Sequence, residues 1–313
     1  MTTDQPTYEG RPLPRPEDEV VDQGLAFDVV TLTSRRRLLA ALGGGLSVLG
    51  LAACGVSATA EGQPTTGSAT TSSGEIPDET AGPYPGDGSN GPDVLEQSGI
   101  VRSDLTSSFG ESTGTAEGVP MTLELTVTDL AAGQPYAGAA VYLWHCTREG
   151  GYSMYSEGIE DENYLRGVQV ADADGLVRFT SIVPGCYDGR WPHLHFEVYP
   201  DEASIADAAD AVATSQLAVP QDVAEAVYAE PGYESSVANL ARTSLDSDNV
   251  FSDGAESQLP ATSGDTDSGY VLTLTVGVDT STEPTGGGMG GGGGAPGGAG
   301  GTAPSGPPPG RPS

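Results

Sequence analysis

The pattern that decides the fold is residues 121–128, MTLELTVT, in which apolar and polar side chains alternate without interruption. A period of two places every second side chain on the same face of an extended chain, so this stretch is predicted to be a β-strand with one buried face. The alternation returns at residues 193–199, and residues 139–144 and 270–278 are predicted as further strands. The ordered part of the chain is therefore expected to be built mainly from β-sheet.

Turns and helices complete the predicted fold. The sequence DADG at residues 172–175 is a turn signal between two strand-like runs, 167–170 and 176–182, and predicts a hairpin. Only residues 203–214 and 221–228 have a helical pattern, and both are acidic. Many short strands with turns about every 8–12 residues predict an all-β fold, an antiparallel β-sandwich with short acidic helical insertions.

The charge of the chain excludes several classes of function. Its 313 residues contain 12 basic side chains, all of them Arg, against 44 acidic ones, which gives a formal net charge of −32. Nucleic-acid binding needs a cationic surface, and so does loose adhesion to an anionic membrane face, so neither is expected. The 46 Gly and 24 Pro, with 36% hydrophobic residues, indicate that the packed core is shorter than the chain.

Residues 1–54 are interpreted as a signal peptide of the twin-arginine type. Arg35-Arg36-Arg37 precede a small and apolar run, residues 40–53, that is too short to span a bilayer comfortably. The run ends in LAAC at residues 51–54, which is similar to the lipobox of bacterial lipoproteins. We therefore expect Cys54 to be lipidated and the protein to be exported and anchored to the outer face of the cytoplasmic membrane. The alternatives are a short buried helix ending in Cys and, given the long segment before the arginines, a start codon further downstream.

The rest of the chain divides by composition into three parts. Residues 55–75 are rich in Ser, Thr and Gly and are predicted to be a flexible linker. Residues 76–279 hold the predicted strands and form the predicted domain. Residues 280–313 are predicted to be a Gly/Pro-rich disordered tail, either a spacer or cell-wall contact or simply a solvated end.

The chemistry is concentrated around His193-Leu194-His195, which contains two of the three histidines. Residues two apart in a strand share a face, so both imidazoles are expected side by side, as a pair of metal ligands or as ordinary surface histidines. The loop that precedes them, residues 184–192, carries Tyr187 and Arg190 between prolines and glycines. Earlier in the chain, Tyr152 follows Gly150-Gly151 at the end of a predicted strand.

These residues, taken in order, resemble the intradiol ring-cleavage dioxygenases, the family of catechol and protocatechuate dioxygenases. The similarity extends from about Glu79 to Tyr199 and more weakly to Val278. It is carried by five segments, which are Gly82–Tyr84, Ala139–His145, Leu165–Phe179, Pro184–Tyr187 and Arg190–Phe196. The long helical N-terminal dimerisation segment of catechol dioxygenases has no evident counterpart, and the sequence carries no signal for an oligomeric state.

The resemblance implies a cofactor, a ligand set and a reaction. The cofactor is Fe(III), a hard cation that suits hard phenolate ligands, and the matching positions are Tyr152, Tyr187, His193 and His195. Tyr155 and Tyr164 compete with Tyr152 for the first position, which Gly150-Gly151 favours. By the same resemblance Tyr187 also acts as a base and Arg190 stabilises negative charge on the substrate. The partners are then an aromatic diol and O₂, and the product is a muconate-type dicarboxylic acid.

The resemblance also bears on the two remaining cysteines. If Tyr152 and Tyr187 meet at one iron, Cys146 and Cys186 are brought near each other, and in an exported protein a disulfide between them is expected. Two free buried thiols are the alternative.

Two other functions compete with the dioxygenase. One is a non-catalytic exported β-sandwich binding module that retains a metal site. The other is a copper or zinc site that uses the two histidines, although a pair of phenolates suits ferric iron better.

Overall fold

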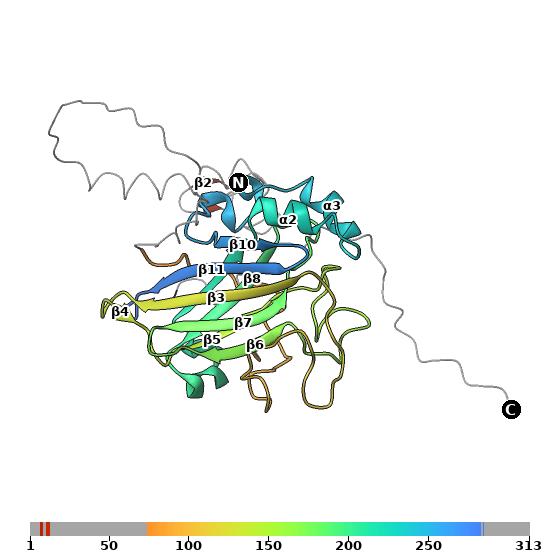
Figure 1. The fold of residues 1–313 in the computed structure, drawn as a ribbon. Coiled ribbons are helices and arrows are strands. Elements are labelled where there is room, and N and C mark those ends of the chain that lie inside the picture. Colours follow the sequence, from red (N-terminus) through yellow and green to blue (C-terminus); the bar gives the residue numbers. More distant parts are fainter. Residues whose placement is uncertain (1–6, 9–10, 13–73, 283, 285–313) are drawn as a thin grey trace, which may run out of the picture. The chain divides into compact units, whose positions relative to one another are not determined.

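The computed structural model describes residues 7–8, 11–12, 74–282 and 284 (Figure 1). Most of the predicted export signal, including the predicted lipidation site Cys54, most of the linker and nearly all of the Gly/Pro-rich tail lie outside the described residues. Near the amino terminus, two short strands, β1 (Thr7–Tyr8) and β2 (Arg11–Pro12), pair antiparallel. The strands of the two larger sheets all lie between Pro120 and Val278.

The first of these sheets is built around β3 (Pro120–Asp129), whose side chains alternate between buried and half-buried along the strand. This is the pattern that the sequence predicts for a strand with one buried face. The sheet has the order β10-β11-β3-β4, and β7 also pairs with β3. The other strands are β4 (Gln134–Pro135), β7 (Leu176–Ile182), β10 (Ala261–Asp265) and β11 (Gly269–Val278).

The pairing of β11 with β3 is parallel, which corrects the prediction of a wholly antiparallel fold. Tyr270 is opposite Met121 and Val278 is opposite Asp129, so the two strands run together along their whole length. Residues 130–268 separate them in sequence. A connection of this length allows β11 to run either parallel or antiparallel to β3. The alternation of side chains within a strand does not indicate which of the two directions forms.

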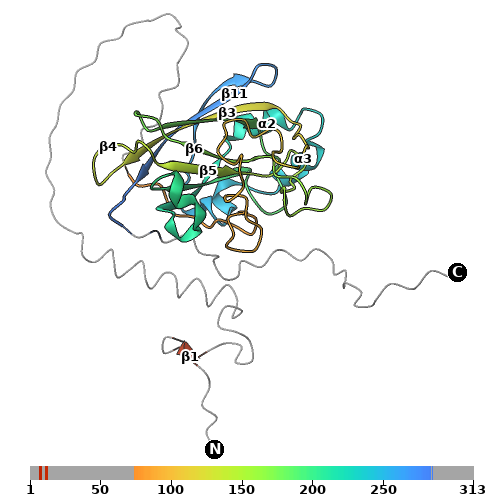
Figure 2. The same cartoon turned by 90° about the horizontal axis from the view of Figure 1, so that it is seen from below.

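The second sheet carries His193 and His195. Its order is β6-β5-β8-β9, with every pair antiparallel. The strands are β5 (Ala140–Trp144), β6 (Arg166–Val170), β8 (His193–Tyr199) and β9 (Ala213–Ala218). The predicted mainly-β character of the chain is confirmed, and Figures 1 and 2 show both sheets, with α2 and α3 at the end opposite β4.

Both faces of the second sheet are buried, and this determines where the site lies. On one face, Leu194 and Phe196 of β8 share a hydrophobic cluster with Leu123 and Phe179 of the first sheet. On the other face, Trp144 of β5 belongs to a second cluster that is closed by loops, among them residues 81–109. The odd-numbered side chains of β8 therefore lie under this loop layer, away from the main core.

The helices are short. They are α2 (Gln221–Val227) and α3 (Glu234–Leu240), with 3₁₀ turns at Glu202–Ala206, Ala208–Asp210, Leu245–Ser247 and Phe251–Asp253. The helix predicted over residues 203–214 is wrong. Asp201 and Asp207 each accept a hydrogen bond from a backbone N–H two or three residues on, so each begins a separate turn, and the chain becomes strand β9 at Ala213. Among the described residues, no helix is long and apolar enough to cross a membrane.

Candidate active site

Strand β8 places two imidazoles side by side. His193 and His195 lie on the face opposite Leu194 and Phe196, as the strand spacing predicts, and both are almost completely buried. The His195 ring is stacked on Trp144 of the neighbouring strand, with centroids 4.9 Å apart and an angle of 6° between the ring planes. The two Nε2 atoms face each other at 3.1 Å.

Two tyrosine hydroxyls from separate loops complete the group. The Tyr187 oxygen lies 3.1 Å from His193 Nε2, and the Tyr152 oxygen lies 3.4 Å from His195 Nε2. Gly150, with φ of 92°, lets the two loops approach, because a Cβ at this position would stand 3.2 Å from Tyr187 Cβ. We call Tyr152, Tyr187, His193 and His195 the His–Tyr cluster.

The structure brings together this set and not the competing tyrosines. The Tyr155 hydroxyl donates to Asn90 Oδ1 at 2.7 Å and accepts from the Gly86 backbone N–H at 2.9 Å, so it is occupied elsewhere. Tyr164 packs in a separate cluster with Leu165 and Ile182. The third histidine, His145, contacts the Ser181 hydroxyl at 2.7 Å and the Cys146 carbonyl at 2.8 Å, so both of its ring nitrogens have partners outside the cluster.

Burial sets the protonation state of the cluster. Desolvation, reinforced by the nearby Arg190 guanidinium, lowers the pKa of His193 well below its usual range, and desolvation with His193 beside it does the same for His195. Desolvation raises the pKa of Tyr187 to about 12 and that of Tyr152 well above its usual value. At neutral pH the imidazoles are therefore uncharged, which is the form that binds a metal.

The donor set fits a metal ion. Nitrogen and oxygen ligands lie about 2.0–2.2 Å from a first-row ion, which places neighbouring ligands about 3 Å apart, as the four cluster atoms are here. His193 Nδ1 lies 2.5 Å from the Trp191 carbonyl, so an N–H donated there leaves the lone pair of Nε2 facing the cluster. Within the described part of the chain, no group of three or more His, Cys, Asp or Glu could hold a metal, so this cluster with its two phenols is the candidate.

The N-terminal segment of the domain covers the cluster. Gly82, with φ of 73°, leaves room for the His195 ring, since a Cβ there would lie 3.2 Å from its Cε1 atom. The Tyr84 ring contacts the Tyr152 ring at 4.9 Å between centroids. Arg166, which is buried, donates to the carbonyls of Tyr84 and Ser153 at 2.9 and 3.0 Å, and so ties this segment to the loop that carries Tyr152.

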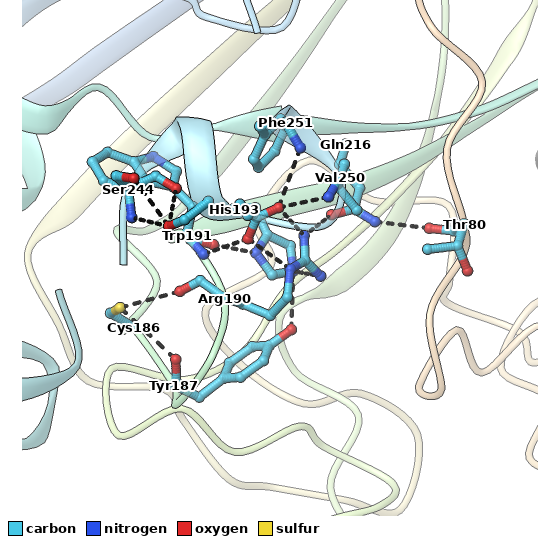
Figure 3. Close-up of polar contacts among 12 residues, drawn as sticks. Thr80, Cys186, Tyr187, Arg190, Trp191, His193, Gln216, Ser244, Val250 and Phe251 are labelled. Atoms are coloured by element: carbon cyan, nitrogen blue, oxygen red, sulfur yellow. Dashed lines mark hydrogen bonds and ion pairs between the residues drawn. The ribbon is translucent and has the colours of Figure 1, made fainter. Parts of the chain in front are cut away.

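Arg190 lies beside the cluster, and Figure 3 shows its side chain together with those of Tyr187 and His193. Its Nη1 atom is 3.5 Å from His193 Nε2. Two residues that sequence reasoning missed hold the rest of its guanidinium, Gln216 on β9 and Asp248. Gln216 is opposite His195 in the β8–β9 register, so a correct prediction of β9 could have found it, whereas no motif marks Asp248.

The predicted disulfide is absent. Cys146 and Cys186 are both free and buried. Each thiol has its own backbone partner, since Cys146 Sγ lies 3.5 Å from the Gly185 carbonyl and Cys186 Sγ lies 3.4 Å from the Arg190 carbonyl. Burial raises the pKa of each thiol to about 12, which leaves little thiolate to begin oxidation at neutral pH.

Comparison with known proteins shows a similarity to dioxygenases. A family model described as a dioxygenase matches residues 90–202, which contain the whole His–Tyr cluster and Arg190. The chain is 40% identical over 57 residues to chlorocatechol 1,2-dioxygenase of Rhodococcus opacus and 39% identical over 71 residues to catechol 1,2-dioxygenase of a Pseudomonas strain. This part of the chain is therefore similar to the intradiol ring-cleavage dioxygenases.

The similarity of the chain to these relatives is partial. The two matches cover 18% and 23% of this chain and 22% and 23% of the relatives, less than a quarter of their length. A solved intradiol ring-cleavage dioxygenase from Tetranychus urticae, 20% identical, superposes with a TM-score of 0.54 over 67% of this chain and 97% of its own. That likeness shows a shared fold. Gln216 and Asp248 lie outside the matched residues 90–202.

Proposed function

We propose that this protein is an iron(III)-dependent intradiol dioxygenase that cleaves catechol-type aromatic diols with O₂ to muconate-type dicarboxylic acids. The observation that carries the proposal is the meeting of two imidazoles and two phenols, with neighbouring atoms 3.1–3.4 Å apart, beside a guanidinium. The match of residues 90–202 to a dioxygenase family model and the partial similarity to two catechol-type 1,2-dioxygenases support it.

The residues that would hold the iron are Tyr152, Tyr187, His193 and His195. Ferric iron bound there would accept both oxygens of the diol and make its aromatic ring reactive toward O₂. The imidazoles are already neutral and available, whereas both phenols must lose a proton on binding, so iron uptake is expected to release protons. A phenolate pair stabilises the ferric state, and the diol supplies the electrons, so no reduced cofactor is required.

Tyr187 is the tyrosine suited to leave its place for the substrate and to act as a base. Its side chain is partly exposed, whereas Tyr152 is 2% exposed and packed between Tyr84 and His195. A phenolate oxygen freed at Tyr187 would take a proton from a substrate hydroxyl, the role of a general base. The positive charge of Arg190 lowers the pKa of Tyr187, against the larger effect of burial, and so stabilises that phenolate.

Arg190 is positioned to stabilise negative charge on the substrate. Its Nη1 atom faces the cluster 3.5 Å from His193 Nε2, next to the almost completely buried Tyr152, His193 and His195. The excess of 44 acidic over 12 basic residues disfavours anionic ligands, so catechols without a ring carboxylate are the proposed substrates.

The proposed function is tested by oxygen uptake. Iron-loaded protein is mixed with catechol in air-saturated buffer without NADH or any other reductant, and O₂ is followed with an electrode. We expect one O₂ consumed per catechol, and His193→Ala and His195→Ala variants that hold little iron and consume none. No uptake by wild-type protein that is shown to hold ferric iron would overturn the proposal.

A further inference from the structure

The guanidinium of Arg190 is held on two of its three nitrogens. Nε donates to Asp248 Oδ2 at 2.9 Å, and Nη2 donates to Gln216 Oε1 at 2.7 Å and approaches Asp248 Oδ1 at 3.4 Å. The remaining nitrogen, Nη1, is the one that faces the His–Tyr cluster. The orientation of the planar group is therefore decided by its partners on the side away from the cluster.

Asp248 is a rigid partner because its carboxylate is itself fully engaged. Its side chain has no exposed surface, while that of Arg190 is 15% exposed. Oδ2 also accepts the Trp191 backbone N–H at 2.7 Å, and Oδ1 accepts those of Val250 and Phe251 at 2.9 and 3.2 Å. Backbone N–H groups next to Arg190 in sequence and close to Asp248 in sequence thus fix the carboxylate, and the Arg190 guanidinium binds an anion that is already held in place.

The segment that carries Asp248 also reaches the histidines. Phe251 packs edge-on against the His193 ring, with centroids 6.5 Å apart. Gln216 is fixed in turn, since its amide nitrogen donates to the Thr80 carbonyl at 2.8 Å (Figure 3). Arg190 is accordingly held from the C-terminal part of the domain and from β9, both beyond the residues that match the family model.

We propose that Asp248 is the positioning residue that holds Arg190 with Nη1 facing the substrate side of the cluster; this rests on the proposed function. Without the carboxylate, the long Arg side chain can take other rotamers and turn its charge toward solvent. Misplacing a charge-stabilising donor lowers the rate of the chemical step more than the affinity for substrate, because the charge develops only during the reaction.

The test is a double-mutant cycle with Asp248→Asn, Arg190→Gln and the pair of them, and Asp246→Asn as a control, since Asp246 is an exposed acid in the preceding turn. In iron-loaded protein, Asp248→Asn is expected to keep the iron content and the visible absorption. We expect its kcat for catechol to fall about 10²-fold and its KM to change less than about threefold. In the Arg190→Gln background, Asp248→Asn is expected to lower kcat by less than about twofold. The control is expected to match the wild type.

A second readout does not depend on turnover. In the metal-free protein, Asp248→Asn is expected to lower the urea midpoint of unfolding clearly in the wild-type background and much less in the Arg190→Gln background, because the lost partner is then already missing. If Asp248→Asn prevents folding, Arg190→Lys is used in its place in the test. Arg190→Lys keeps the positive charge and leaves the backbone contacts of Asp248 unchanged. Because the Lys ammonium lacks the planar pair of nitrogens with which Arg190 contacts Asp248, Arg190→Lys is expected to lose about as much kcat as Arg190→Gln.

The outcomes separate the positioning role from the proposed function. Equal losses of kcat from Asp248→Asn in both backgrounds, a wild-type kcat in Asp248→Asn or Arg190→Lys, or no coupling in the metal-free cycle would each overturn the positioning role. Wild-type and Asp246→Asn proteins that hold iron and do not turn over would overturn the proposed function instead. The metal-free cycle would still decide whether Asp248 acts through Arg190.

Discussion

The two tyrosines that compete for the first ligand position, Tyr152 and Tyr155, are expected to respond in opposite ways to loss of the hydroxyl. The Tyr155 hydroxyl makes two good hydrogen bonds, at 2.7 and 2.9 Å, and the second satisfies a buried backbone N–H. At about 1 kcal/mol for each bond, Tyr155→Phe should cost about 1–2 kcal/mol of unfolding free energy. The contact of the Tyr152 hydroxyl with His195 is 3.4 Å long, so Tyr152→Phe should cost less than about 1 kcal/mol in the metal-free protein.

The order reverses once iron is bound. Phenolate bound to ferric iron absorbs visible light, so iron-loaded wild-type protein should be coloured. Tyr152→Phe should shift or bleach this band, and Tyr155→Phe should leave it unchanged. Urea unfolding of the metal-free variants and visible absorption of the iron-loaded ones measure the two effects. A Tyr155→Phe protein that bleaches, beside a Tyr152→Phe protein that keeps its colour, would refute the assignment of the first ligand.

Three further predictions concern other parts of the chain. Arg190→Gln should keep the iron colour and lose about 10²–10³ in kcat, because it removes a charge-stabilising donor and no ligand; bleaching would show instead that the iron site depends on it. Burial, with Asp253 nearby, raises the pKa of Glu79 to about 7, so its folded form binds a proton that the unfolded form has lost. The free energy of unfolding should therefore fall as pH rises from about 4.5 to about 7. Measured by urea titration at several pH values, it should change less with pH in Glu79→Gln than in the wild type, and an equal change in both would contradict this pKa. We also propose that Cys54 carries a lipid on the outer face of the cytoplasmic membrane, so fractionation should find the protein with membranes and Cys54→Ala in the soluble fraction; wild-type protein found only in the cytosol would refute both export and anchoring.

Local patterns predicted the strands that have one polar and one apolar face. Strand β3 alternates because its two faces differ in burial. Strand β9 was missed because ATSQLA shows no alternation of apolar and polar side chains, although all six residues are buried. The helix expected near residue 203 failed because aspartates began new turns, a local hydrogen-bonding preference that outweighed the apparent helical periodicity.

The residues of the candidate site that belong to local sequence motifs could be predicted. His193 and His195 follow from strand geometry, and the tyrosines and Arg190 follow from a resemblance carried by an ordered series of motifs. Gln216 and Asp248 reach Arg190 only through tertiary contacts, across 26 and 58 residues of chain. The disulfide failed for a related reason, since proximity in the fold does not fix the direction in which a thiol points.

Product analysis under ¹⁸O₂ tests the central claim most directly. Iron-loaded protein is incubated with catechol and ¹⁸O₂, and the product is identified by mass spectrometry against a muconic acid standard. The account predicts a dicarboxylic acid cleaved between the two hydroxyl-bearing carbons, with both ¹⁸O atoms of one O₂ molecule incorporated. A yellow semialdehyde, formed by cleavage beside the diol, or a product without ¹⁸O, would contradict it.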